Sequence, residues 1–261
     1  MQPNEPSHDG DRGQAMRSIS SSRKWVYAAD HSFLGALPTH VNIGDHVSLP
    51  KEGQRRSYRL QRRAVKQAET HLALARAAFE LHSSMGPSRT TVSAIAEKAG
   101  VQRLTVYRHF PDEEAVFSAC SAYSFGQDPP PNPEVWRSIA EPEARLRTAL
   151  LQLYGYYSRK RQLLANLYRD AEMPVVAAAL VRRRDVLAKG VAILETGWLG
   201  PGSENARLLV AAIGHALDFT TWRSLVENQG LSEDEAVEAM LVLVRCVSSS
   251  LADCRGEKPS A

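Results

Sequence analysis

The residues with the clearest chemical pattern lie in residues 91–110, where small apolar residues alternate with polar and basic ones at helical spacing. The second half of this segment gathers hydrogen-bonding and cationic side chains: Gln102, Arg103, Thr105, Tyr107, Arg108 and His109. The grooves of double-stranded DNA present donors and acceptors on their floors and phosphates on their walls. Such side chains on one helix therefore predict contact with DNA.

Individual residues of this segment suit particular groups of DNA. Arg103 can bind O6 and N7 of guanine together, and Gln102 can pair with adenine. Leu104 suits a thymine methyl, whereas Tyr107 and His109 are better placed for phosphates. A merely solvated helix face is the alternative interpretation. The residues predicted to contact DNA are Arg55, Arg56, Arg62, Arg63, Thr91, Gln102, Arg103, Leu104, Thr105, Tyr107, Arg108 and His109.

Two short helices joined by a turn must position these side chains. The apolar residues Val92, Ile95, Ala96 and Ala99 predict a first helix. Thr91 is its expected N-cap, and Gly100 supplies the positive φ expected just after its end. Residues 104–110 predict a second helix with Val106 and Phe110 pointing inward. Two short helices joined by a glycine-containing turn form a helix-turn-helix.

Longer helices are expected on both sides of this pair. From about residue 59, an apolar residue recurs every three or four positions, at Val65, Ala68, Leu72, Ala75 and Phe79. This spacing predicts one buried face of a helix that ends at Gly86 and Pro87. After Pro111, the acidic run of residues 112–114 is typical of the positive end of a further helix.

Basic residues concentrate before and within this region. The whole chain carries a formal net charge of +3, but residues 51–110 hold twelve Lys or Arg and four Asp or Glu, a local excess of +8. Such a block is the electrostatic footprint of a polyanion partner, although basic arms also bind RNA or anionic membranes. We expect the arginines of residues 55–63 to contact phosphates or to enter the minor groove.

Two runs resemble the DNA-binding domain of TetR/AcrR-type transcriptional regulators. They are Ile95-Ala96-Glu97-Lys98-Ala99-Gly100-Val101 and Tyr107-Arg108-His109-Phe110-Pro111, the latter followed by an acidic helix start. The resemblance covers residues 64–117, while the rest of the chain matches the family in length and helical architecture. It implies an Ω-shaped, all-α homodimer that binds a small inducer in its C-terminal domain and dimerises through its last two long helices.

Three positions depart from the family pattern. Gln102 stands where the family usually has Ser or Thr capping the second helix, and Leu104 replaces a small residue. Glu113 stands where a Lys commonly touches phosphate, which puts one backbone contact in doubt. The N-terminal extension is also longer than usual in the family.

The remainder of the chain predicts helices only. Residues 126–133 hold four prolines and cannot form a regular helix. Residues 203–227 predict one helix, and Ser232 with Glu235 predicts a capping box that opens the last one. The expected organisation is a disordered extension (1–54), a three-helix helix-turn-helix domain with a basic arm (55–125), a Pro-rich linker (126–133), a helical ligand-binding and dimerisation bundle (134–254) and a disordered tail (255–261).

The family resemblance implies a ligand pocket within the C-terminal helices. The candidate lining residues are Tyr154, Tyr157, Tyr168, Met173, His215, Phe219 and Trp222. Ordinary core packing is the alternative for each of them, and we interpret His215 in particular as a core histidine. We interpret residues 182–184, three consecutive arginines, as a solvated helix face, with binding of an anionic ligand as the alternative.

Several function classes find no support in the sequence. It has no nucleophile elbow, no Gly-rich phosphate loop and no cluster with metal-ligand spacing, so we expect neither an enzyme nor a metal or other cofactor. The three cysteines are widely spaced, which predicts no disulfide framework. No apolar run approaches the roughly 18 residues of a membrane span, and no secretory pattern occurs, so we expect a cytoplasmic protein without a membrane partner.

Together these patterns predict a sequence-specific repressor of transcription. We expect a homodimer that binds a palindromic operator in double-stranded DNA and is released by a small molecule. One alternative is a weakly specific DNA-binding member of the family without an inducer, in which the basic arm dominates. The other is an all-α enzyme.

Overall fold

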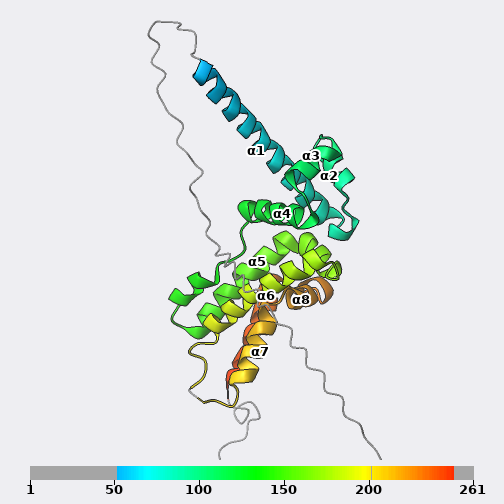
Figure 1. The fold of residues 1–261 in the computed structure, drawn as a ribbon. Helices are drawn as coiled ribbons and strands as arrows, with labels where there is room; N and C mark the ends of the chain where they lie inside the picture. Colours follow the sequence, from blue (N-terminus) through cyan, green and yellow to red (C-terminus); the bar gives the residue numbers. More distant parts are fainter. Residues whose placement is uncertain (1–51, 201, 250–261) are drawn as a thin grey trace, which may run out of the picture. The chain divides into compact units, whose positions relative to one another are not determined.

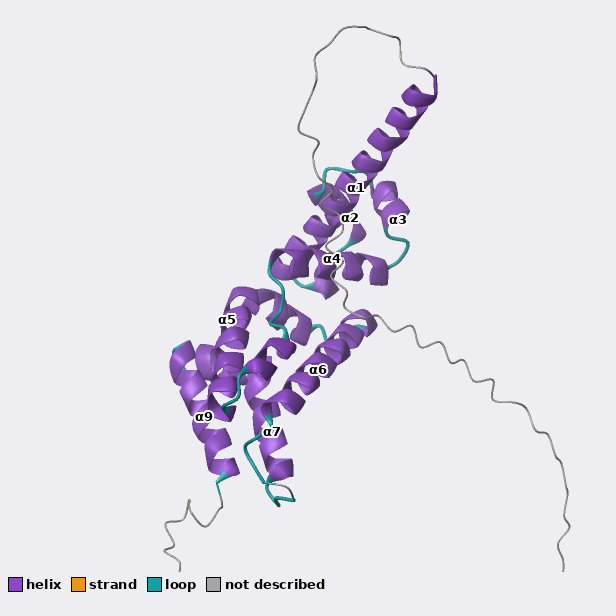
Figure 2. Ribbon diagram, turned by 90° about the vertical axis from the view of Figure 1, so that its left-hand side faces the viewer, coloured by secondary structure: helices purple, strands orange, loops and turns teal. Residues whose placement is uncertain are grey.

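The computed structural model describes residues 52–200 and 202–249, and all regular secondary structure within these ranges is helical. Figures 1 and 2 show the helices, and no strand occurs among them in either view. The predicted all-α class is confirmed. The segments predicted to be disordered, residues 1–54 and 255–261, lie outside the described residues except for the first turn of α1.

The first helix, α1 (Glu52–Ser84), is buried only in its second half. Leu74, Ala78 and Leu81 follow one another at helical spacing and are buried in the core. The expected face was partly wrong, because Val65 is 57% and Leu72 58% exposed. Figure 1 shows the reason: the N-terminal half of α1 extends beyond the helices that cover its second half.

The second half of α1 packs against three short helices. These are α2 (Val92–Lys98), α3 (Arg103–His109) and α4 (Glu113–Gln127), with the 3-10 turn η1 (Pro87–Arg89) between α1 and α2. Their shared core includes Ile95, Val106, Phe110, Val116 and Cys120. The expected linker starts later than predicted, because α4 continues through Gly126 to Gln127.

The C-terminal helices form a second hydrophobic core. They are η2 (Pro133–Ser138), α5 (Pro142–Arg169), α6 (Pro174–Leu194), α7 (Ala206–Leu217), α8 (Phe219–Trp222), the π-helix η3 (Arg223–Asn228) and α9 (Glu233–Ser248). Leu146, Leu150 and Leu153 of α5 form one stripe of this core, as Leu241 and Val244 do for α9.

The predicted continuous helix over residues 203–227 is broken at Asp218. Its ψ of 141° is extended, so the carbonyls before it lose their intrahelical donors. Two buried tyrosines of α5 replace those donors. The hydroxyl of Tyr154 donates to the carbonyl of Ala216 at 2.9 Å, and that of Tyr157 donates to the carbonyl of Leu217 at 2.6 Å. The break is therefore stabilised by side chains that periodicity does not reveal.

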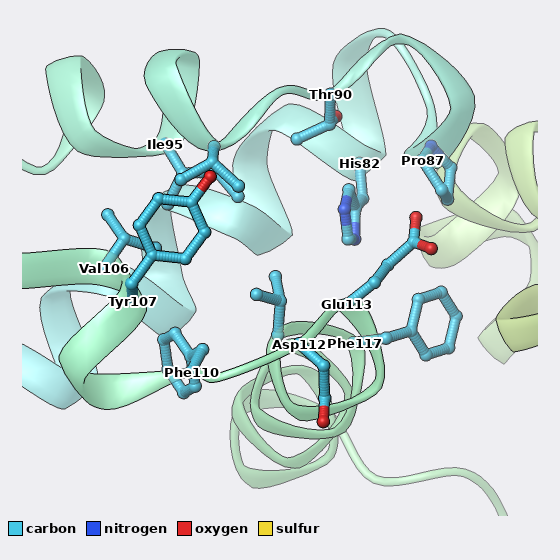
Figure 3. A pocket seen from close by; sticks show the side chains of 12 residues that line it. His82, Pro87, Thr90, Ile95, Val106, Tyr107, Phe110, Asp112, Glu113 and Phe117 are labelled. Carbon is cyan, nitrogen blue, oxygen red and sulfur yellow. The ribbon is translucent and has the colours of Figure 1, made fainter. Parts of the chain in front are cut away.

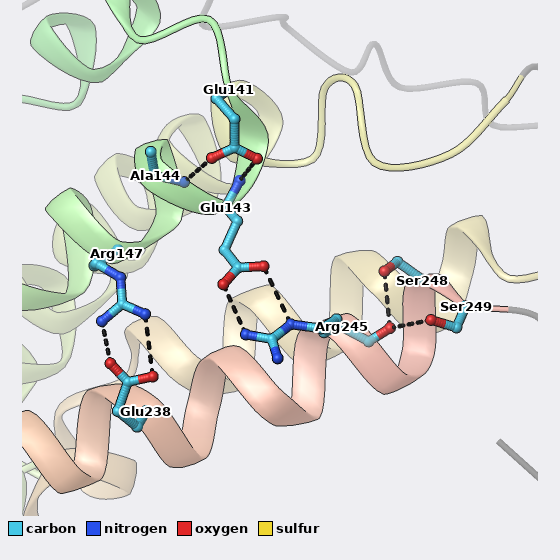
Figure 4. A network of polar contacts seen from close by, with 8 residues as sticks. All are labelled: Glu141, Glu143, Ala144, Arg147, Glu238, Arg245, Ser248 and Ser249. Atoms are coloured by element: carbon cyan, nitrogen blue, oxygen red, sulfur yellow. Dashed lines mark hydrogen bonds and ion pairs between the residues drawn. The ribbon is translucent and has the colours of Figure 1, made fainter.

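Ion pairs join α5 to α9 at the protein surface (Figure 4). Arg147 pairs with Glu238, and Arg245 binds both carboxylate oxygens of Glu143, at 2.7 and 3.1 Å. These pairs are partly exposed, so each contributes about 0–1 kcal/mol, and apolar burial supplies most of the attachment. The predicted capping box of Ser232 at the start of α9 is present.

A set of hydrogen bonds, here called the clasp, joins α5 to the end of α1. The side-chain amide of Asn166 donates to the carbonyls of His82 and Ser83, at 3.0 and 2.8 Å. Arg169 donates to the carbonyl of Met85 at 2.8 Å. The last carbonyls of a helix lack intrahelical donors, and the clasp supplies them from a distant part of the chain.

The backbone at the clasp requires glycine. Gly86 has a φ of 94°, which L-residues with a side chain rarely adopt. A Cβ at this position would lie 2.0 Å from Nη2 of Arg169 and 2.6 Å from a carboxylate oxygen of Asp170. That carboxylate accepts the backbone N–H of Ser88 at 3.0 Å, and the Arg169 guanidinium lowers its pKa to about 2. The clasp is therefore ionised and closely packed.

His82 beside the clasp predicts acid sensitivity. Burial lowers the pKa of its imidazole from 6.5 to about 4, although the charge of Asp170 partly opposes the shift. The unfolded chain therefore takes up a proton at a pH where the folded chain does not, so stability is full above pH 6.5 and is lost as the pH falls towards 4. We expect the free energy of unfolding in urea to fall by about 2 kcal/mol from pH 7 to pH 5 through this group.

The variant His82→Phe isolates this contribution. It keeps an aromatic ring beside Phe117, whose ring centroid lies 5.8 Å from that of His82. The pH dependence between pH 7 and pH 5 should shrink by about 2 kcal/mol in the variant. An unchanged pH dependence would show that His82 is readily protonated in the folded protein.

Candidate nucleic-acid interface

The turn between α2 and α3 has the geometry that the sequence predicts for it. Gly100 has a φ of 65°, and its N–H donates to the carbonyl of Glu97 at 3.0 Å. The N–H of Val101 donates to the carbonyl of Ala96 at 2.9 Å. This pair of bonds is the Schellman motif, which satisfies the last carbonyls of α2. The direction in which α3 leaves the turn is thereby determined.

α3 buries one side and exposes the other. Val106 is fully buried and Phe110, which follows the helix, is 3% exposed. On the other side Leu104 is 59% and Tyr107 45% exposed, and the side chains of Gln102, Arg103 and Arg108 are exposed as well. An exposed leucine and tyrosine beside arginines form a surface that can contact both bases and phosphates.

Arg103 and Tyr107 are held together on this surface. Nη2 of Arg103 donates to the hydroxyl of Tyr107 at 3.1 Å, and the guanidinium carbon lies 5.7 Å from the ring centroid. Residues four positions apart on a helix lie on one face, so the contact follows from their spacing. It restricts the guanidinium before any partner binds, which reduces the entropy lost on binding.

The two residues before the helices differ in what their side chains do. The Thr91 hydroxyl accepts the N–H of Ala94 at 3.1 Å and caps α2 as predicted. Gln102 occupies the N-cap position of α3 without a side-chain hydrogen bond to that helix. Its amide is therefore not used in capping. The departure from Ser or Thr removes a cap and adds a longer polar group at the exposed surface.

His109 and Thr105 are partly buried, unlike the other predicted contact residues whose side chains the structure describes. The ring of His109 lies 5.8 Å from that of His71, which in turn lies 4.7 Å from Phe110. Burial, with a smaller contribution from His109, lowers the pKa of His71. His71 was not singled out in the sequence, because its partners lie almost forty residues further along the chain.

Glu113 occupies the first turn of α4, whose N-cap Asp112 accepts the N–H of Ala115 at 2.8 Å. Glu113 lines a cavity of about 190 Å³ together with Tyr107, His82 and Phe117. Figure 3 shows Tyr107 on one side of this cavity and Glu113 extending towards its His82 side. Glu113 and Tyr107 therefore line the same cavity from different sides.

The basic half of α1 adds exposed positive charge. Arg56, Arg59, Arg62, Arg63 and Lys66 are all exposed, whereas the side chain of Arg55 lies outside the described part. The guanidinium of Arg62 lies 5.8 Å from the ring centroid of Tyr58. By contrast, Lys98 and Arg76 both pair with Glu80, at 2.9 and 2.8 Å. The basic arm therefore supplies cations that the helix-turn-helix core does not neutralise.

Five of the seven predicted ligand-site residues come together in the second core. Tyr154, Tyr157, Tyr168, Phe219 and Trp222 form a chain of ring contacts with centroids 5.3–6.3 Å apart. We call this set the aromatic cluster.

The structure does not bring the other two predicted residues into the aromatic cluster. His215 is exposed, so its interpretation as a core histidine was wrong; its Nδ1 lies 3.2 Å from the hydroxyl of Thr221. Met173 is the N-cap residue of α6 and is only partly buried. Within residues 52–200 and 202–249, no three His, Cys, Asp or Glu side chains gather as a metal site. No helix in these ranges is long and apolar enough to cross a membrane.

The family comparison agrees with the fold of the helix-turn-helix. Residues 74–120 match the model of the bacterial regulatory proteins of the tetR family. This range contains the packed half of α1, all of α2 and α3 and the first half of α4. Among curated proteins, none matches the chain.

Solved structures of regulators are similar to this chain. A TetR-like transcriptional regulator from Rhodococcus sp. RHA1 is 18% identical, with a TM-score of 0.50 over 72% of this chain and 97% of the other. NalD, the secondary repressor of the MexAB-OprM multidrug efflux pump in Pseudomonas aeruginosa, is 22% identical, with a TM-score of 0.49 over 68% and 96%. The Rhodococcus structure confirms the shared all-α fold.

Gly100 and Gly126 provide a matched pair for testing the turn. A Cβ would meet nothing within 4 Å at either position, but only Gly100 has a positive φ. Gly100→Ala should lower the free energy of unfolding by about 1–2 kcal/mol, because of backbone strain alone. Gly126→Ala, within α4, should raise it by about 0.5–1 kcal/mol. Urea denaturation of both variants checks this, and equal effects would contradict the role of Gly100.

Proposed function

We propose that this chain is a transcriptional regulator of the tetR family, whose model its residues 74–120 match. In this proposal it is a homodimeric, cytoplasmic repressor that binds operator DNA and is released by a small molecule. The observation that carries the proposal is α3 itself. Its buried side is anchored by Val106 and Phe110, while its other side exposes Arg103, Leu104 and Tyr107. A helix held in this way can enter the major groove without reorganising.

The predicted base-contacting residues have separate roles in this proposal. Arg103 binds guanine through its guanidinium, Gln102 binds adenine, and Leu104 contacts a thymine methyl. Tyr107, Arg108 and His109 contact phosphates, as do the arginines of the basic arm. Tyr107 also positions Arg103 through the hydrogen bond between their side chains.

Exposed apolar residues on the last two long helical segments support self-association. On α7, Leu208 is 54% and Val210 39% exposed, and on α9 Val242 is 50% and Leu243 37% exposed. Pairing these segments with those of a second copy would bury side chains that a monomer leaves in water. In the resulting dimer, two α3 helices must meet successive major grooves, about 34–36 Å apart.

Release by a ligand is proposed to act through this spacing. A ligand that binds more tightly to a dimer with a different separation of its α3 helices shifts the population away from the DNA-binding form. The feature that supports this is α5, which contributes tyrosines to the aromatic cluster and Asn166 to the clasp. A displacement of the aromatic cluster can therefore reach α1 through α5 and the clasp.

A second candidate is weakly specific DNA binding without an inducer. It is favoured by the exposed basic arm on α1 and by the acidic Glu113, which lines the same cavity as Tyr107. In that case affinity depends mainly on counterion release and changes little with DNA sequence. The two candidates therefore differ in their dependence on sequence and on salt.

Arg103→Ala tests whether α3 recognises bases. The wild-type protein should bind a palindrome from the DNA upstream of its own gene more tightly than random duplex, measured by fluorescence anisotropy at physiological salt. Arg103→Ala should weaken this binding by about 1–3 kcal/mol and relax the preference for one base pair. If the variant keeps the wild-type preference for that base pair, Arg103 does not contact the base.

Arg62→Ala is the matched control on the basic arm. It should weaken binding to all duplexes equally and reduce the salt dependence by about one counterion. Equal affinity of the wild-type protein for palindrome and random duplex, with a steep salt dependence, would contradict specific recognition and support the second candidate.

A further inference from the structure

Arg183 on α6 is partly buried, and two of its three guanidinium nitrogens are shielded without an acceptor. Its Nε and Nη2 atoms are shielded from solvent, and neither has a hydrogen-bond partner within the described residues. The neighbouring Arg182 and Arg184 are exposed. The interpretation of residues 182–184 as a solvated face is therefore wrong for the middle arginine. Buried donors without acceptors are costly, and native proteins rarely keep them without a purpose.

The two unpartnered atoms are the ones that bind carboxylates elsewhere in this protein. Arg159 uses Nε and Nη2 to hold both oxygens of Asp128, at 3.1 and 3.2 Å. Arg245 binds Glu143 through the same two atoms, at 3.1 and 2.7 Å. This edge of a guanidinium matches the spacing of two carboxylate oxygens. Arg183 presents the same edge without a carboxylate.

The surroundings of Arg183 are aromatic. Its guanidinium carbon lies 5.0 Å from the ring centroid of Tyr157, which contacts Phe219 at 5.6 Å and Trp222 at 6.1 Å. The indole N–H of Trp222 is also buried without an acceptor. The aromatic cluster therefore lies beside buried donor atoms, on Arg183 and Trp222, that have no acceptor among the described residues.

No acid in the described ranges lies within 4 Å of Arg183 as an ion-pair partner. Burial raises the pKa of both Tyr157 and Tyr168, and the nearby charge of Asp218 adds to this rise. However, its carboxylate caps α8 and accepts the N–H of Thr220 at 2.7 Å. Within the described residues, Arg183 therefore has tyrosine neighbours, with a hydrogen bond to Tyr168, and no carboxylate partner.

We propose that Arg183 and the aromatic cluster bind a small organic carboxylate, with its carboxylate on the Nε and Nη2 edge and its apolar body among the rings. This deepens the proposed function, on which it rests, by naming the chemical class of the inducer. One guanidinium edge matches one carboxylate group, and buried aromatic rings favour an apolar body.

The cluster must open to admit this ligand, because Tyr154, Tyr157, Phe219 and Trp222 are at most 1% exposed. The adjacent backbone is suited to such a change. The helix is broken at Asp218, and the π-helical turn η3 follows α8 directly. Single π-turns are frequent at functional sites. Displacing the ring of Tyr157 would also release the carbonyl of Leu217, which its hydroxyl now holds.

Calorimetry on the DNA-free, full-length protein tests the site. The probes are 2-naphthoate and decanoate, each compared with its neutral amide. At least one carboxylate should bind tenfold or more tightly than its amide. Arg183→Met should abolish this preference, and Arg183→Lys, which keeps the charge without the paired donors, should lose most of it. Arg184→Met, at the exposed neighbouring position, should retain it.

Thermal melting separates ligand binding from a structural role. Because Nε and Nη2 of Arg183 make no hydrogen bond within the described residues, Arg183→Met should melt close to the wild-type temperature. A variant that melts well below the wild type and keeps the carboxylate preference would overturn the proposal, as would carboxylates that bind no better than their amides.

The proposed function is tested separately, by adding the same carboxylate to the protein–operator complex. If the carboxylate binds but DNA is not released, ligand-controlled repression is contradicted, and the proposed carboxylate site still holds. If the protein binds its operator specifically but shows no preference for carboxylates in calorimetry, the proposed carboxylate site is wrong, and the proposal of DNA recognition still holds.

Discussion

The clasp joins the end of α1, in the first hydrophobic core, to α5, in the second, and the attachment of one core to the other depends on it. The end of α1 must present carbonyls without helical donors, and Asn166 and Arg169 supply those donors from the last turns of α5. A buried carbonyl left without a donor would lower the free energy of unfolding by about 1–3 kcal/mol. The fold therefore strongly favours the arrangement in which α5 supplies these donors. Gly86 makes it possible by leaving room for the guanidinium.

The same helix that closes the clasp also supports the break between α7 and α8. Tyr154 and Tyr157 hold the carbonyls on the N-terminal side of Asp218, and they lie about 3.3 and 2.5 turns before Asn166 on α5. A rigid helix with one contact in its middle and another near its C-terminal end can transmit a displacement between them. The unpaired edge of Arg183 lies against Tyr157, so the proposed ligand would act at the start of this connection.

Features set by neighbouring residues could be predicted from the sequence. Gly100 ends α2, Asp112 caps α4 and Ser232 opens α9 with a capping box, because each depends on a few adjacent residues. The all-α class and the amphipathic character of α3 follow from periodicity in the same way.

Features that depend on distant residues could not be predicted. Val65 and Leu72 have suitable spacing but no covering element, so they are exposed. Asn166 meets carbonyls more than eighty residues away, and nothing near it in the sequence marks that contact. Arg183 looked solvated because it lies between two exposed arginines, yet it is partly buried against Tyr157 of α5. Long-range packing, rather than residue type, decided each of these environments.

Hydroxyl-radical footprinting of the DNA upstream of the gene tests the central claim most directly. A dimer with two α3 helices in successive major grooves predicts two protected patches on one face of the duplex, about 10–10.5 base pairs apart between centres and related by two-fold symmetry. Uniform weak protection along the duplex, or a single unpaired patch, would contradict recognition by a dimeric helix-turn-helix protein.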